Sequence, residues 1–169
     1  RLQAGASRPA GHRCAHGALS ETMQGSPPFL TGKLLLAMPG IGDPRFERSV
    51  IAMCQHDEDG ALGIGIGRIM PRMGLHTLLE QFEIPTDRVA DTPIHLGGPV
   101  EPQRGFVLHS LDWSGQGSLQ VANLWGLTAT IEILRVIGTE KGPKRWMVAL
   151  GYAGWGPGQL DGEMHRHGW

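Results

Sequence analysis

Residues 49–68 read SVIAMCQHDEDGALGIGIGR and decide the fold class of the chain. Ser49–Cys54 is a short apolar run with the length of a buried strand. Ala61–Arg68 alternates glycine with leucine or isoleucine, which gives a second strand one aliphatic face and one bare face that another backbone or a ligand can approach. Asp57–Gly60 between them is a polar connection whose glycine can adopt a positive φ. The segment therefore predicts a β-hairpin.

Further strands are predicted where similar apolar runs end at turn residues. These runs are Lys33–Met38, Pro93–Leu96, Gly105–Ser110, Ser118–Ala122 and Arg145–Tyr152. Gly154–Gly158, which follows the last run, is predicted as a turn.

Three short helices are predicted between and after these strands. In Gly74–Glu83, the residues Leu75, Leu78, Leu79 and Phe82 share one helical face. Thr128 is the expected N-cap of a second helix, with Gly138 at its C-terminus, and Gln159–His167 forms a third. The element order predicts an α+β fold with a compact mixed or antiparallel β core and a few short flanking helices.

The length of 169 residues corresponds to one domain, expected over residues 29–169, and residues 1–28 are expected to be a disordered tail without apolar periodicity. Met23, just before the first strand, is the expected start of the functional protein. The content of 26 Gly and 12 Pro fits a fold rich in turns and argues against a helical bundle.

Charge and cysteine usage exclude several classes of protein. A formal net charge of -1 argues against direct nucleic-acid binding, and no apolar run approaches the roughly 18 residues of a membrane span. Cys14 and Cys54 form no CxxC motif, which indicates reduced thiols and a cytoplasmic location. His12, Cys14 and His16 alternate in the tail without a fourth ligand, so the sequence predicts no metal site, and it predicts no cofactor.

Candidate binding residues lie where strands begin or end. Arg48 and Arg104 precede buried strands, where a guanidinium can hold a carboxylate or phosphate, although surface arginines also occur there. Gly97 and Gly98 form a turn that could present backbone N–H groups to an anion or simply close a strand.

Ser49 and His56 lie at opposite ends of one strand, some 20 Å apart, so a nucleophile–base pair within this strand is excluded. His95 or His109 could still approach Ser49 from another strand. Trp155 and Gln159 belong to the unusual stretch Gly151–Leu160, in which the indole is either exposed for stacking or packed as a plug.

These motifs together resemble the AlgH/YqgE family of bacterial proteins. The matching segments, in order, are Leu30–Gly40, Asp43–Val50 with His56, Gly60–Gly63, Gly97–Val100, Arg104–His109 and Leu150–Leu160. The resemblance implies an α+β fold, a cytoplasmic bacterial protein and a name taken from a regulator of alginate synthesis, without a demonstrated mechanism. The chain has Gly67–Pro71 in place of the family's Asn-Arg-Pro run, and the resemblance also implies a further C-terminal segment after Trp169.

Three functions stay open, and the sequence does not decide whether the chain is an enzyme. The first is a transcriptional regulator of unknown mechanism, which could act through a protein partner instead of DNA, and the second is a protein that binds a small molecule or anion. The third is a hydrolase that uses Ser49 or a histidine. We expect Arg48, Ser49, Gly98, Arg104 and Trp155 to converge in part at one edge of the β core.

Overall fold

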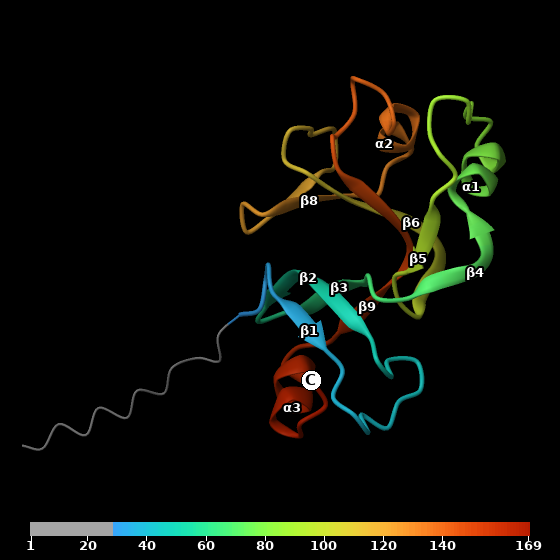
Figure 1. Cartoon of the computed structure of the whole chain (residues 1–169). Helices are drawn as coiled ribbons and strands as arrows, with labels where there is room; N and C mark the ends of the chain where they lie inside the picture. The colour runs from blue at the N-terminus through green and yellow to red at the C-terminus, as the bar shows by residue number, and fades with distance from the viewer. Residues whose placement is uncertain (1–28) are drawn as a thin grey trace, which may run out of the picture.

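The computed structural model describes residues 29–169, so the expected tail and its His12, Cys14 and His16 lie outside the described residues. The described chain forms nine strands and three helices (Figure 1). The strands are β1 (Leu34–Leu36), β2 (Val50–Asp57), β3 (Gly60–Gly65), β4 (Ile69–Gly74), β5 (Pro93–Leu96), β6 (Val100–His109), β7 (Leu119–Val121), β8 (Trp125–Thr128) and β9 (Trp146–Trp155). The helices are α1 (Leu75–Gln81), α2 (Ile131–Val136) and α3 (Gln159–His165).

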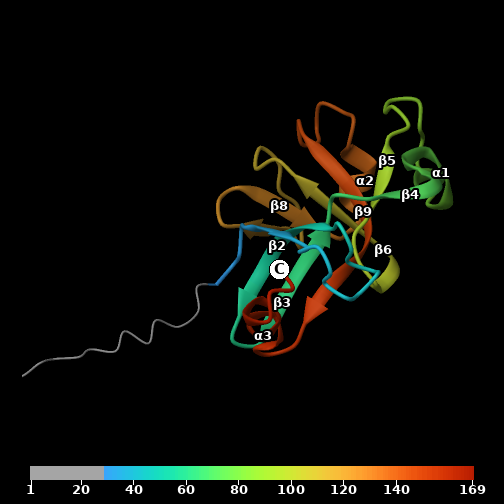
Figure 2. The ribbon, with the colours of Figure 1, turned by 60° about the horizontal axis from the view of Figure 1, so that its bottom comes forward.

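The strands form one curled sheet in the order β1-β2-β3-β9-β6-β8-β7, with β5 pairing β9 and β4 pairing β5. Every pair is antiparallel except β5 with β9, which is parallel. Helices α1 and α2 lie at one end of the molecule and α3 at the other (Figures 1 and 2). The predicted α+β class with a mixed β core is therefore confirmed.

The predicted hairpin is formed by β2 and β3, which pair from Asp57 with Gly60 to Ile51 with Gly65. The face of β3 that carries no side chains is explained by close packing against its neighbours. A Cβ on Gly63 would lie 2.5 Å from the Ile51 side chain, and one on Gly65 would lie 2.4 Å from the Leu96 carbonyl oxygen. Glycine therefore allows the segment after β5 to approach the sheet closely.

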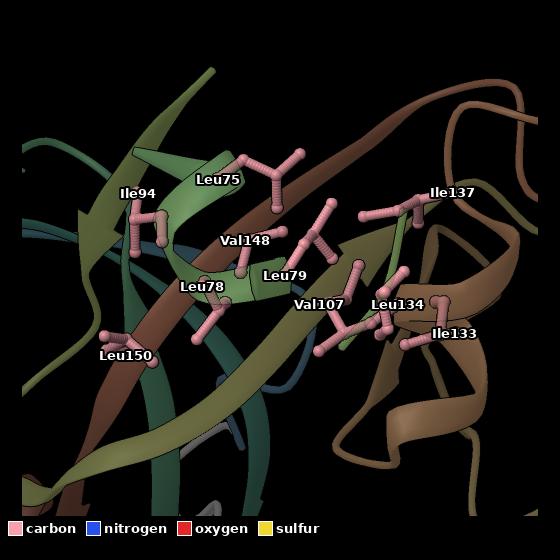
Figure 3. Close-up of a cluster of buried hydrophobic side chains, with 11 residues drawn as sticks. Leu75, Leu78, Leu79, Ile94, Val107, Ile133, Leu134, Ile137, Val148 and Leu150 are labelled. Carbon is pink, nitrogen blue, oxygen red and sulfur yellow. The ribbon is translucent and has the colours of Figure 1, made fainter. Parts of the chain in front are cut away.

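Buried side chains from both helices at one end pack on β5, β6 and β9 (Figure 3). This cluster contains Leu75, Leu78, Leu79, Ile84, Ile94, Val107, Ile133, Leu134, Ile137, Val148 and Leu150. A second cluster, which includes Ile64, Phe106 and Ala149, lies on the opposite faces of the strands, and a third joins Leu160 of α3 to Ile51 and Trp155.

Some local predictions were wrong. Strands β4 and β8 were not predicted, and β9 continues through Trp155, where a turn was expected. Thr128 is the buried last residue of β8, while Thr130 occupies the N-cap position of α2 without a side-chain capping bond. Within residues 29–169, no helix is long and apolar enough to cross a membrane.

Candidate functional site

A cavity of about 370 Å³ lies between the loop that precedes β2, the end of β3 and the turn that follows β5. Its lining consists of Pro44, Arg45, Phe46, Ser49, Val50, Ile51, Gly65, Gly67, Arg68, Leu96, Gly97, Gly98 and Pro99. Most of these residues offer aliphatic, aromatic or bare backbone surface, which is the usual composition of a small-molecule site.

The wall after β5 depends on glycine. Gly97 donates its N–H to the Leu150 carbonyl oxygen at 2.8 Å, and its own carbonyl accepts the Gly65 N–H at 2.7 Å. Gly98 has a φ of +156°, and a Cβ there would lie 2.1 Å from the Tyr152 carbonyl carbon. The turn is therefore pressed against β9, and this close packing fixes its place at the cavity.

Several hydrogen-bond donors of the lining have no partner within residues 29–169. Ser49 is a buried residue whose hydroxyl makes no hydrogen bond to any of these residues, and the N–H groups of Gly67 and Gly98 donate to no acceptor among them. Arg68 is exposed, and its guanidinium donates only a long bond of 3.4 Å to the Arg45 carbonyl oxygen. The lining thus holds donors that a ligand oxygen could accept from.

The loop at the mouth is braced by Asp43 and Arg45. The Asp43 carboxylate accepts the Arg45 backbone N–H at 2.9 Å and two bonds from Arg45 Nε, and it also forms an ion pair of 2.7 Å with Arg45 Nη2. These hydrogen bonds from the Arg45 side chain and backbone hold the pKa of Asp43 below its ordinary value. The loop therefore carries one guanidinium to the edge of the cavity.

A second cavity of about 400 Å³ adjoins the first and shares Arg45, Phe46 and Pro99 with it. Its wall contains Glu163, whose Oε2 accepts the indole N–H of Trp155 at 2.9 Å and of Trp169 at 2.8 Å. Gln159 donates to Oε1 of Glu163 at 3.0 Å. Burial raises the pKa of this carboxyl, but the three hydrogen bonds outweigh burial and the pKa lies below its ordinary value.

The structure brings together five of the eight predicted binding residues. Ser49, Gly97 and Gly98 line the first cavity, and Trp155 and Gln159 line the second. Trp155 is 7% exposed, so its indole is packed and not free for stacking.

The two predicted arginines lie outside both cavities. Arg48 is exposed, with a φ of 57°. Arg104 forms an ion pair of 3.2 Å with Glu101 and lies over the Phe106 ring. The arginines that do line the first cavity are Arg45 and Arg68, which the sequence analysis missed. For Arg45, the available sequence signal was the turn-forming Asp43-Pro44 pair directly before it.

His56 is also outside both cavities, buried between the start of the described chain and α3. Its Nδ1 accepts the Leu30 N–H at 3.0 Å, and its Nε2 lies 3.7 Å from Asp161. The Phe29 ring meets the imidazole edge-on at 5.4 Å. These contacts tie distant segments together, which is a structural role.

Groups for nucleophilic or metal chemistry do not gather in the first cavity. His109 bonds to Thr128 and not to Ser49, and no group of three or more potential metal ligands occurs in the described part of the chain. Burial raises the pKa of the Cys54 thiol to about 11, and its Sγ donates to the Ala52 carbonyl oxygen at 3.5 Å. Cys54 is therefore a neutral thiol near pH 7.

The geometry defines a class: a small α+β protein with a curled, largely antiparallel sheet and a ligand-sized cavity at the strand ends. Residues 34–169 match the family model described as AlgH-like. The chain therefore belongs to the AlgH-like family, the AlgH/YqgE family predicted from its motifs.

Relatives of similar length support this membership. The chain is 64% identical to a UPF0301 protein of Rhizorhabdus wittichii over 144 residues, which cover 85% of this chain and 77% of the relative. It is 59% identical to a UPF0301 protein of Sphingopyxis alaskensis, with 87% and 79% covered.

The solution structure of the AlgH protein from Pseudomonas aeruginosa is similar to this fold. It has a TM-score of 0.73 and 36% identity, with 86% of this chain and 78% of that chain covered. A crystal structure from Corynebacterium diphtheriae, 20% identical with a TM-score of 0.63, shares the fold.

Proposed function

We propose that this chain binds a small molecule that has an apolar body and an anionic group, in the first cavity. One observation carries the proposal: apolar walls, including Phe46, Val50 and Leu96, enclose donors without partners among the described residues. An apolar body gains from leaving water along these walls, and a carboxylate or phosphate gains from the donors.

The donors favour an anion over a cation. Ser49, Gly67 and Gly98 each offer an N–H or O–H, and Arg68 and Arg45 add positive charge at the mouth. Asp43 neutralises Arg45 in part, so Arg68 is the cation to which we assign the anionic group.

The test uses two ligands with the same eight-carbon body, octanoate and 1-octanol, titrated calorimetrically into the full chain. Because only octanoate carries a charge, we expect it to bind more tightly. Arg68→Gln should weaken octanoate binding about five- to tenfold, the loss of a charge-assisted hydrogen bond at an open mouth, and leave octanol binding unchanged.

Arg104→Gln is the matched control, because Arg104 is an exposed arginine outside both cavities. It should bind both ligands as the wild type does. Equal octanoate affinity for Arg68→Gln and wild type, or no binding of either ligand, would contradict the proposal.

We also propose that the ligand-binding chain acts as a cytoplasmic regulator of transcription through a protein partner. The family resemblance suggests regulation, and the charge favours a protein partner over DNA. Residues 29–169 hold 12 Lys and Arg against 15 Asp and Glu, a net charge of −3. The test compares the proteins that the chain captures with and without octanoate. The proposal expects capture of a partner to change with octanoate, and a captured set that does not depend on octanoate would contradict it.

A further inference from the structure

Three polar side chains form a line of hydrogen bonds that neither cavity described above includes. Ser118 Oγ lies 2.7 Å from Thr128 Oγ1, which lies 2.9 Å from Nε2 of His109. His109 ends β6 and Thr128 ends β8, and these strands pair side by side, while Ser118 directly precedes β7. The three residues come from separate segments, so the sheet topology assembles the line.

For a neutral His109 ring, the surrounding contacts set the direction of each hydrogen bond in this line. The other imidazole nitrogen, Nδ1, lies 2.9 Å from the Ser110 carbonyl oxygen, which can only accept, so Nδ1 carries a proton. In the neutral ring Nε2 is then an acceptor, and Thr128 must donate to it. Because the Thr128 proton is used in this way, the Ser118 hydroxyl donates to Thr128.

The line runs from a buried base to an accessible hydroxyl. Thr128 is fully buried and His109 is 4% exposed, whereas Ser118 is half-buried. Gly126 makes room for the imidazole, because a Cβ there would lie 2.3 Å from its Cε1 atom. The Trp113 ring meets the imidazole edge-on at 5.3 Å.

Ser118 and His109 both line a small cavity of about 210 Å³, together with Trp113, Ser114 and Gln120. A reagent of a few carbon atoms can therefore reach the Ser118 hydroxyl at the end of the line. The Ser118 Oγ also accepts the Gly115 N–H at 3.0 Å, which holds the side chain in one orientation.

We propose that Ser118 is a nucleophile for small electrophilic esters and phosphoryl fluorides, with His109 as its base through Thr128. In the step, Ser118 Oγ bonds to the carbonyl carbon or phosphorus, and the bond to the leaving group breaks with its electron pair. The Ser118 proton passes to Thr128 while the Thr128 proton passes to Nε2 of His109. The Ser110 carbonyl accepts the Nδ1–H of the resulting imidazolium.

The test treats the full chain with diisopropyl fluorophosphate, from which fluoride leaves, and locates the adduct by peptide mass spectrometry. We expect a single adduct on Ser118. Thr128→Val keeps the shape of the side chain but removes the relay, so the labelling rate constant should fall about a hundredfold, within the range of a positioned base. Ser114→Ala, in the same cavity but outside the line, should label at the wild-type rate.

Circular dichroism and the melting temperature establish that each variant is folded before labelling is compared. Absence of an adduct on Ser118 in the folded wild type, or labelling no faster than at Ser114, would overturn the proposal. Equal labelling of folded Thr128→Val and wild type would overturn the role of the relay. The test is independent of octanoate binding, so its result does not depend on the proposed function.

Discussion

Glu163 is a carboxylate held by three neutral donors, the Trp155 and Trp169 indoles and the Gln159 amide. Charge-assisted bonds of this kind favour the ionised form. The carboxylate also links α3 to the end of β9 and to Trp169, so its protonation state bears on the hydrogen bonds in the wall of the second cavity.

Glu163→Gln should lower the free energy of unfolding by about 1–2 kcal/mol at pH 7, because one oxygen cannot serve all three donors. The folded pKa of Glu163 lies below its unfolded value, so the wild-type advantage is complete above the unfolded pKa and is lost as pH falls through the folded pKa. Urea unfolding of both chains from pH 7 to pH 3 measures this. Glu58→Gln, on the exposed hairpin turn, should show no such convergence, and a constant gap for Glu163→Gln would contradict the assignment.

Gly98→Ala should destabilise the chain by about 3 kcal/mol or more, since the new methyl group would lie 2.1 Å from the backbone of Tyr152. Gly158→Ala is the matched control, because Gly158 also has a positive φ, of 68°, but nothing lies within 4 Å of its Cβ position. We expect that control to cost about 1 kcal/mol, from backbone strain alone. Similar losses in thermal or urea unfolding for the two variants would show that the turn is not pressed against β9.

Among the elements, helix α1 contains one residue whose burial its periodicity predicts correctly and one whose burial it predicts wrongly. Leu79 is 1% exposed in the core, whereas Phe82, expected on the same face, is 46% exposed. Phe82 is the C-cap residue with a φ of −103°, so the helical phase ends before it.

Leu79→Ala should therefore cost about 2–4 kcal/mol in the free energy of unfolding, and Phe82→Ala less than about 1 kcal/mol. Chemical denaturation of the two variants side by side is the measurement. A loss for Phe82→Ala as large as that for Leu79→Ala would mean that Phe82 packs in the core.

Strands with continuous apolar runs, such as β2 and β9, were predictable, because burial on both faces leaves a plain signal in the sequence. Strand β4 gave no such signal. It contains Pro71 and Arg72, the latter with a φ of 63°, and its pairing with β5 is irregular. Strand β8 has only four residues, and its pairing with the adjacent β7 and with the more distant β6 defines it.

The parts of the candidate site that lie at glycine turns and strand ends were predictable from the sequence. The parts that depend on the conformation of a loop were not. The Gly97-Gly98 pair indicates a close turn, and Ser49 directly precedes the buried strand β2. Whether Arg45 or Arg48 lines the cavity depends on the turn braced by Asp43 and on the positive φ of Arg48, which no periodicity encodes. Arg68 was not predictable as a lining residue, because its place at the cavity depends on how the ends of β3 and β5 lie together in space.

At the scale of the whole molecule, the formal net charge of −1, which is −3 over residues 29–169, predicts no appreciable binding to random duplex DNA. We expect a dissociation constant weaker than about 10⁻⁴ M at physiological salt, the weak end of non-specific binding. Fluorescence anisotropy with a labelled duplex at two salt concentrations measures it. Micromolar binding that weakens steeply with salt would favour a regulator that contacts DNA itself.

The most direct test of the ligand-binding proposal is an amide ¹H–¹⁵N correlation spectrum of the full chain, followed during titration with octanoate. The proposal predicts saturable shifts at Gly67, Gly98 and Val50, which line the first cavity, and none at Gly126 beside His109. Shifts that are absent, that do not saturate, or that appear away from the first cavity would contradict it.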